Sequence, residues 1–175
     1  MVATVNNVLI STKALSPIIR QARIGYEKLY KKEIFGFLFG RIEARDAEIL
    51  RAKKYKEGTR SGVDYDIEEA HKRARICAKR FKLKFLGMYH SHVEIAGKKS
   101  WGLSPPDRKA IRDENSITEL LVGVYASADW RRLPVIEYAQ KRMFIYDRKY
   151  KYGYSVSAYT KQLGKARLTP IWLKW

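Results

Sequence analysis

Apolar residues recur along this chain with two different periods, and the two periods predict alternating helices and strands. A helical face, with apolar positions three and four residues apart, runs through one N-terminal segment as Ile18, Ala22, Tyr26 and Leu29. The same spacing returns in the segment IEEAHKRARICAKRF. We therefore expect helices over Pro17–Lys32 and Asp66–Arg80, a short helix that begins at Ser104, and a helix around Ser155–Leu163.

Short apolar runs without a helical period predict buried strands. The run IFGFLFGRIE, punctuated by Gly36 and Gly40, is followed by a turn at Arg45–Asp46 and a hairpin partner. We expect strands over Val5–Ser11, Ile34–Glu43, Glu48–Lys56, Phe85–His92 and Glu119–Ala128, with one or two more in Leu133–Asp147. Helices interleaved with mostly hairpin-connected strands favour an α/β fold, a three-layer α/β sandwich with a central mixed β-sheet.

The 175 residues suit one domain, since domains commonly have about 100–200 residues, and no repeat or linker divides the chain. From Tyr150 onward the pattern weakens into a basic, Tyr-rich segment. We predict one domain over residues 1–149, with residues 150–175 as a C-terminal tail that packs on this domain or extends from it.

The charge of the chain adds a prediction about its partners. The formal net charge is +18, which suggests an anionic partner such as nucleic acid, an acidic protein or a membrane surface. Lys and Arg are spread over the whole length, however, so we favour a charged and well-solvated exterior over a dedicated nucleic-acid patch. Charge alone does not decide between the two interpretations.

Location and redox chemistry follow from what the sequence lacks. No apolar run approaches the roughly 20 residues that cross a bilayer, and the first residues do not resemble a signal peptide. We therefore expect a cytoplasmic protein with no membrane partner. A single cysteine, Cys77, excludes an internal disulfide and any CxxC zinc clamp, and its helical segment favours a small buried thiol.

His90 and His92 are the first candidates for chemistry. Side chains two residues apart on a strand point to the same face, so both imidazoles can be directed at one point. Neutral imidazole is the commonest metal ligand in proteins and binds zinc at about 2.0–2.1 Å. The alternative is a pair of incidental histidines near a strand end, and the spacing alone does not exclude it.

The segment Ser104-Pro105-Pro106-Asp107 permits two interpretations as well. Ser at the N-cap, Pro at the first helical position and an acid at the third make a good helix start without any catalysis. Alternatively, Asp107 turns towards the two histidines as a third metal ligand and leaves Ser104 to face a substrate. The two hypotheses diverge at Asp107, because a carboxylate that binds metal is not expected to cap fully.

Glu33 follows a basic helical segment and precedes a strongly apolar strand. An acid at a helix C-terminus is disfavoured by the helix dipole, so helix propensity does not explain its position. Strand alternation puts it on the face of Phe35, Phe37 and Phe39, where a carboxylate is costly unless it has a partner. It is either a base beside a metal-bound water or a strand-end Glu that bends out to solvent.

Taken together, these residues resemble the signature of the JAMM (MPN-plus) metallopeptidases, including their prokaryotic and archaeal members. That signature is a distant Glu, then H-[ST]-H, then S-x-x-D. Here the order is Glu33, then His90-Ser91-His92, then Ser104-x-x-Asp107. The combination is far more specific than any one of its parts.

The resemblance covers roughly Val5–Asp147, with two departures in one loop. Eleven residues, Val93–Leu103, separate the second His from the Ser, where the family usually has seven. Val93 also stands where the family often has Pro. Loops tolerate insertion, so these departures affect the expected substrate groove more than the expected metal site. Trp101 in this loop lies where it could cover the groove.

The resemblance implies a function and a division of labour. One zinc ion would be held by His90, His92 and Asp107, with a catalytic water in the fourth position. Glu33 would take the proton of this water, and Ser104 would donate a hydrogen bond to the developing oxyanion. The implied substrates are conjugates of a ubiquitin-like modifier, cleaved after the C-terminal glycines of the modifier, and the charge of the chain favours an acidic one.

Two other classes compete with the peptidase. An inactive scaffold of the same fold would lack ligands, whereas every ligand position is filled here. A nucleic-acid-binding protein on an MPN-like scaffold fits the charge, but no RRM, zinc-finger or helix-turn-helix signature accompanies it. A zinc nucleobase deaminase needs P-C-x-x-C, which a chain with one cysteine cannot supply. The sequence predicts no oligomeric state.

Overall fold

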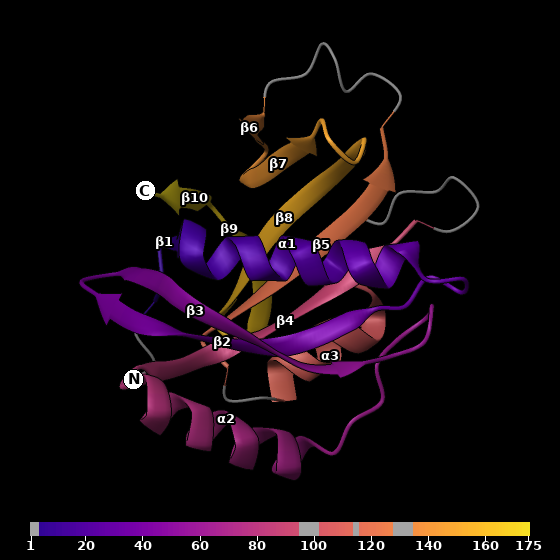
Figure 1. The fold of residues 1–175 in the computed structure, drawn as a ribbon. Coiled ribbons are helices and arrows are strands. Elements are labelled where there is room, and N and C mark those ends of the chain that lie inside the picture. The colour runs from indigo at the N-terminus through magenta and orange to yellow at the C-terminus, as the bar shows by residue number, and fades with distance from the viewer. Residues whose placement is uncertain (1–3, 95–101, 114–115, 128–134) are drawn as a thin grey trace.

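The computed structural model describes residues 4–94, 102–113, 116–127 and 135–175, with residues 112 and 113 described by their backbone only (Figure 1). Its helices are α1 (Thr12–Glu27), α2 (Ile67–Phe81) and α3 (Pro105–Asp113). Its strands are β1 (Asn7–Ser11), β2 (Ile34–Glu43), β3 (Asp46–Glu57), β4 (Lys84–Val93), β5 (Thr118–Ala126), β6 (Ile136–Ala139), β7 (Arg142–Asp147), β8 (Tyr152–Gln162), β9 (Lys165–Thr169) and β10 (Ile171–Lys174).

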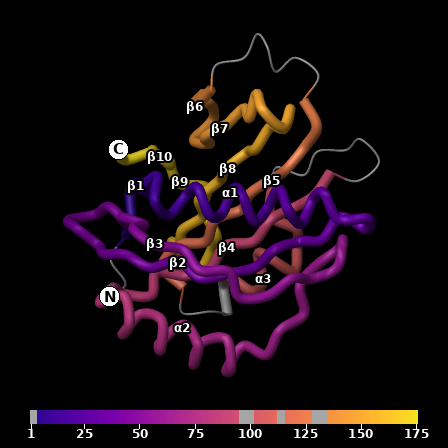
Figure 2. Tube along the Cα trace, viewed as in Figure 1, coloured from indigo at the N-terminus to yellow at the C-terminus, as the bar shows by residue number. Residues whose placement is uncertain are grey.

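The strands of the described residues form one mixed sheet in the order β10-β1-β3-β2-β4-β5-β8-β7-β6, with β9 paired to β8. Three pairs are parallel, β1 with β10, β1 with β3 and β4 with β5. The sheet curls until its outer strands approach each other (Figures 1 and 2). The rings of Tyr138 in β6 and Trp172 in β10 are 5.0 Å apart between centroids, and the backbone N–H of Leu173 donates to the Tyr138 hydroxyl at 3.1 Å.

The predicted three-layer α/β sandwich is therefore wrong. Strands make up 49% of the described residues and helices 25%, and the sheet is a curled, mixed half-barrel. Helix α1 lies on the face towards which the sheet curls, against a core drawn from strands along the whole sheet (Figure 2). This core includes Val8, Leu38, Leu86, Val122, Tyr154 and Ile171. Helices α2 and α3 cover separate parts of the outer face with two smaller clusters.

Bulges beside glycines explain the curl. The β2–β3 register shifts at Phe35/Gly36 and again at Phe39/Gly40, and the β2–β4 register shifts at Leu38/Phe39. Each bulge bends a strand and increases its twist. Gly40 leaves no room for a side chain, since a Cβ there would lie 1.8 Å from the carbonyl oxygen of Glu48. Hydrophobic period predicts strands but carries no signal for these bends.

Helix α1 begins and ends about five residues earlier than predicted. Ser11 is its N-cap, with the side chain accepting from the Ala14 backbone N–H at 3.2 Å. The chain leaves the helix at Lys28, so Leu29 is 87% exposed instead of forming part of the apolar face. The other predicted positions of that face, Ile18, Ala22 and Tyr26, are buried.

The predicted helix around Ser155–Leu163 is wrong, because these residues belong to β8. Tyr154, Val156 and Ala158 alternate into the core beneath α1, which is the two-residue period of a strand. β8 lies between β5 and β7, and β9 and β10 continue the same sheet, so residues 152–174 supply three of its strands.

Among the described residues, no helix has the length and apolar character needed to span a membrane.

Candidate metal centre

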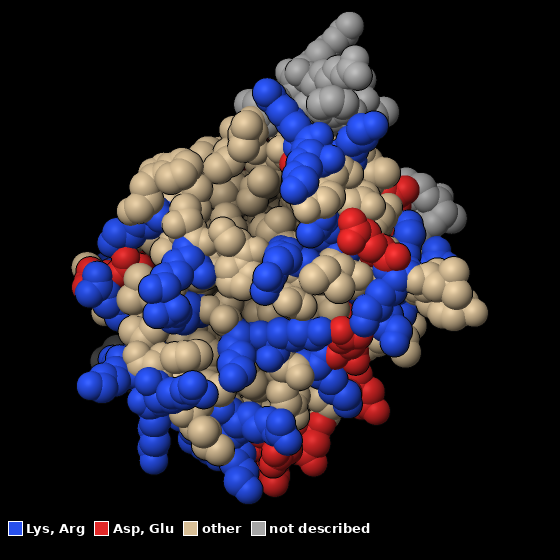
Figure 3. Space-filling model, viewed as in Figure 1, with Lys and Arg blue, Asp and Glu red and all other residues tan. Residues whose placement is uncertain are grey.

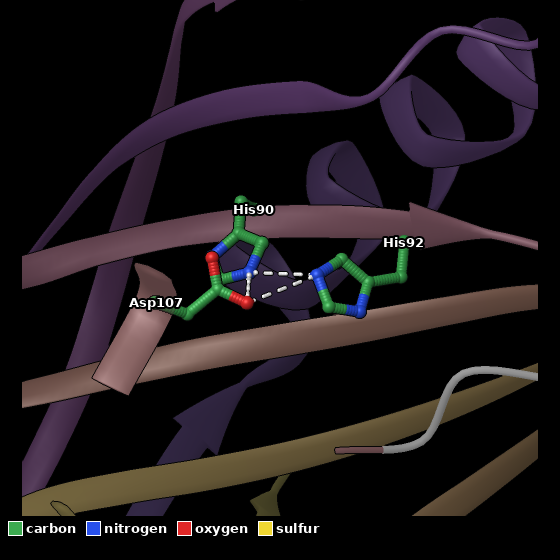
Figure 4. Close-up of side chains that lie close together, drawn as sticks. All are labelled: His90, His92 and Asp107. Carbon is green, nitrogen blue, oxygen red and sulfur yellow. Dashed lines mark hydrogen bonds and ion pairs between the residues drawn. The ribbon is translucent and has the colours of Figure 1, made fainter. Parts of the chain in front are cut away.

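Strand β4 directs His90 and His92 to the outer face of the sheet, as alternation predicts. Their Nε2 atoms lie 3.2 Å apart, and the two residues are 7% and 8% exposed (Figure 4). Ser91, between them, points to the opposite face, where its hydroxyl accepts a hydrogen bond from the Ile34 backbone N–H at 2.9 Å. The middle residue of the motif thus ties β4 to the start of β2.

Asp107 completes the group from the first turn of α3. Its Oδ2 lies 3.6 Å from His90 Nε2 and 3.3 Å from His92 Nε2 (Figure 4). The same Oδ2 accepts from the Ser104 backbone N–H at 2.8 Å and from the Ser104 hydroxyl at 2.6 Å, while the Asp107 N–H donates to Ser104 Oγ at 3.3 Å. Helix capping and convergence on the histidines, treated above as alternatives, occur together.

The three ligand atoms fit a zinc ion. They lie within 4.8 Å of one another and could hold a metal. Their separations of 3.2, 3.3 and 3.6 Å form a nearly equilateral triangle. A tetrahedral zinc with bonds of about 2.0–2.1 Å requires ligand atoms about 3.3–3.4 Å apart. Two imidazoles and one carboxylate are also a donor set that zinc commonly takes.

Glu119 belongs to the candidate site, and the sequence analysis missed it. It lies on β5, is 6% exposed, and its Oε1 lies 2.8 Å from His90 Nδ1. A carboxylate on one ring nitrogen fixes the tautomer and leaves the other nitrogen for a metal. The sequence did carry a signal for Glu119, because it is an acidic residue at the start of an apolar strand. The same argument singled out Glu33.

Glu33 is buried, with 8% exposure, beside this group. Backbone hydrogen bonds hold it, because its N–H donates to the Thr59 carbonyl and its carbonyl accepts from the Gly58 N–H, each at 2.9 Å. Burial raises the pKa of its carboxyl to about 7, a shift that His90 opposes and Asp107 reinforces. Of the two interpretations of Glu33, the strand-end Glu that bends out to solvent is therefore wrong.

The electrostatics of the group favour a positive charge. Burial alone would lower the pKa of His90, but the carboxylates of Asp107 and Glu119 raise it to about 10. Burial would raise the pKa of Asp107, yet the imidazoles of His90 and His92 hold it below its usual range. The carboxylates around His90 therefore favour a positive charge here, as a bound metal ion would supply.

A cavity of about 420 Å³ brings all five predicted residues together. It is lined by Glu33, His90, His92, Ser104 and Asp107, and by Glu119 and the connection that precedes α2. Most of the Val93–Leu103 loop, including Trp101, lies outside the described residues, so its predicted position over the groove is not described.

Comparisons with known proteins report on the fold. No family model matches the chain, and no curated protein matches it. The solution structure of protein DSY2949 from Desulfitobacterium hafniense is similar, with a TM-score of 0.57, 15% sequence identity, and coverage of 95% of this chain and 92% of that one. At this identity the likeness establishes a shared half-barrel fold and nothing about chemistry.

Proposed function

We propose that this protein is a zinc-dependent peptidase of the JAMM type, which hydrolyses the bond after the C-terminal glycines of a ubiquitin-like modifier. The observation that carries the proposal is the triangle of His90 Nε2, His92 Nε2 and Asp107 Oδ2 beside the buried carboxylate of Glu33. Three protein ligands that face a cavity are typical of a catalytic zinc, whereas a structural zinc is usually closed by a fourth ligand.

Zinc in this site would supply a water with a pKa of about 7 and a Lewis acid for the substrate carbonyl. Glu33 is suited to hold the proton that is removed from the water and to pass it to the leaving amine. Its buried carboxyl, with a pKa of about 7, both accepts and releases a proton near neutral pH.

Ser104 is suited to stabilise the oxyanion once Asp107 serves as a ligand. Its hydroxyl now donates to Asp107 Oδ2 at 2.6 Å, and both residues line the cavity. When Oδ2 acts as a metal ligand, it competes less well for this proton. The Ser104 hydroxyl can then turn into the cavity and donate to the developing oxyanion.

The first test is metal content. Protein purified without chelator should contain one zinc per chain by elemental analysis, and His90→Ala and Asp107→Ala should lose it. Asp66→Ala is the matched control, because Asp66 caps α2 through the Glu69 N–H at 2.9 Å. It should lose about 1 kcal/mol of stability and keep its zinc. Wild-type protein without zinc, or Asp107→Ala with full zinc, contradicts the site.

The second test separates the base from the ligands. Glu33→Gln should keep both zinc and fold but lose cleavage of a Gly-Gly-linked modifier fusion, because it removes the proton acceptor alone. Ser104→Ala should lower kcat by about 10²–10³-fold, the effect of one lost oxyanion donor. Cleavage by Glu33→Gln at the wild-type rate would show that another group is the base.

A further inference from the structure

The connection between α1 and β2 displays two large apolar side chains to solvent. Leu29 is 87% exposed and Tyr30 76% exposed, side by side and only a few residues before Glu33. Single exposed apolar residues are common on protein surfaces and require no explanation. An adjacent pair at the rim of a candidate active site is less common, and Tyr is among the residues that contribute most to binding at interfaces.

This turn is held in one conformation by its own backbone. The N–H of Lys31 donates to the Lys28 carbonyl and the N–H of Lys32 to the Gly25 carbonyl, each at 2.8 Å. Lys28 also pairs with Glu57 of β3. A Cβ at Gly25 would lie 2.4 Å from the Lys32 carbonyl oxygen, so this close return of the chain requires glycine. The two apolar side chains are thus presented on a preorganised support, which lowers the entropic cost of binding.

The turn is continuous with the candidate active site. A hollow of about 470 Å³ lies beside it, lined by Leu29, Tyr30, Lys31, Lys32, Gly58, Thr59 and Arg60. Arg60 lines the metal cavity as well, so the two hollows share a wall. The lining carries three cations and no acid, and Figure 3 shows Lys and Arg side chains over much of this face of the molecule.

We propose that the Leu29–Tyr30 turn is the docking site for the folded body of the substrate. Its partner surface is an apolar patch bordered by Asp and Glu, which complements Leu29 and Tyr30 and the cations Lys31, Lys32 and Arg60 that line the same hollow. The inference rests on the proposed function in one respect, that the docked protein delivers its C-terminal tail to the metal cavity. A second copy of this chain fits poorly, because a two-fold contact would bring the three cations against themselves.

The experiment compares two probes and two variants. The probes are a ubiquitin-fold protein of net negative charge, joined through its C-terminal Gly-Gly to a fluorescent protein, and a fluorogenic peptide of the same last six residues. The test variant is Leu29→Ala/Tyr30→Ala. The control is Ile76→Ala/Leu163→Ala, which removes two apolar side chains that are 60% and 102% exposed elsewhere.

The test variant should raise KM for the fusion about ten-fold or more, the scale of losing interface anchors, with kcat and peptide cleavage unchanged. The control should behave as wild type with both probes. The proposal is overturned if the test variant loses cleavage of the peptide and of the fusion equally, or if KM for the fusion does not change. So does sedimentation that shows a wild-type dimer dissociated by the test variant, because a second copy would then occupy the turn.

A binding measurement keeps this test separate from the proposed function. If wild-type protein cleaves neither probe, the peptidase proposal fails and fluorescence anisotropy decides the docking proposal alone. Glu33→Gln should bind the uncleaved fusion at least ten-fold more tightly than the same protein with Leu29→Ala/Tyr30→Ala added. Equal binding by the two proteins, or no binding by either, overturns the docking site.

Discussion

At the scale of single residues, the carboxylate of Asp107 both caps a helix and lies against the two histidines. Its Oδ2 accepts hydrogen bonds from Ser104 and approaches both histidines. The cap orients the carboxylate before any metal arrives, because its hydrogen bonds hold the Asp107 side chain against the first turn of α3. An Asp in a pattern that is typical of a helix start can therefore also be a metal ligand.

Glu119 contacts His90 of the candidate metal site, so we predict that its substitution has a graded effect on metal binding. Glu119→Gln should weaken zinc affinity about 10–100-fold without abolishing binding, the usual effect of losing a carboxylate behind a histidine ligand. Competition with a chromophoric chelator measures this affinity. Glu137→Gln, on the exposed strand β6, is the control and should match wild type. Unchanged affinity in Glu119→Gln would mean that the carboxylate contributes only to packing.

The candidate metal ligands could be predicted because their spacing follows from chemistry. An HxH pair on a strand and a capping-type S-x-x-D are local patterns, and the resemblance joined them to Glu33. Glu119 and the hydroxyl of Ser91 could not be found in this way. Their partners, His90 and Ile34, lie on neighbouring strands, and strand neighbours are not visible in a linear pattern.

At the scale of elements, strands with a clear period were predicted well and irregular features were not. β2 has the predicted limits, since an unbroken run of apolar residues and glycines from Ile34 to Gly40 opens it. β8 was mistaken for a helix because its small Ser and Ala residues suit either structure. The bulge in β4 beside Gly87 could not be predicted, since it depends on the pairing with β2.

Gly87 makes the importance of this bulge testable. It has φ of 149°, and a Cβ there would lie 1.8 Å from the Thr118 carbonyl oxygen. Gly87→Ala should therefore push β5 away from β4, with a loss of about 3 kcal/mol in the free energy of unfolding by urea. Zinc affinity should fall as well, because β5 carries Glu119.

Gly164→Ala is the matched control for that variant. Gly164 also has positive φ, 72°, but a Cβ there would meet nothing within 4 Å. It should lose only about 1–2 kcal/mol from backbone strain and keep normal zinc affinity. Equal losses in the two variants would show that strain, and not the contact with β5, determines the effect.

At the scale of the whole molecule, the half-barrel could not be predicted from periodicity. Curvature arises from the sum of several bulges and from a contact between β6 and β10, which are far apart along the chain. Charge, in contrast, is a property of the sequence that the fold distributes over the surface. Figure 3 shows basic side chains over the face that carries α1, β3 and α2.

The net charge of +18 predicts a dependence on salt. Long-range attraction raises the association rate of an acidic substrate more than its intrinsic affinity. Cleavage at sub-saturating substrate should fall as salt rises, since the Debye length shortens from about 10 Å at 0.1 M to about 3 Å at 1 M. kcat should change little, because Glu33 and Ser104 act at contact distance.

The same titration distinguishes the nucleic-acid alternative. Counterion release would make DNA or RNA binding fall steeply and linearly with the logarithm of salt concentration. Such binding, with no cleavage of a modifier fusion, would favour a nucleic-acid-binding protein. Cleavage of an acidic fusion that does not respond to salt would leave the charge as a property of the solvated surface.

Strand β1 acquires its two neighbours at very different times during synthesis. One parallel neighbour, β3, begins at residue 46, whereas the other, β10, consists of residues 171–174. While the ribosome makes the residues between, the outer side of β1 presents unpaired backbone groups of the kind that recruit a strand from another chain. A nascent chain of this protein is therefore most prone to aggregate, and most dependent on a chaperone, until β10 has left the exit tunnel.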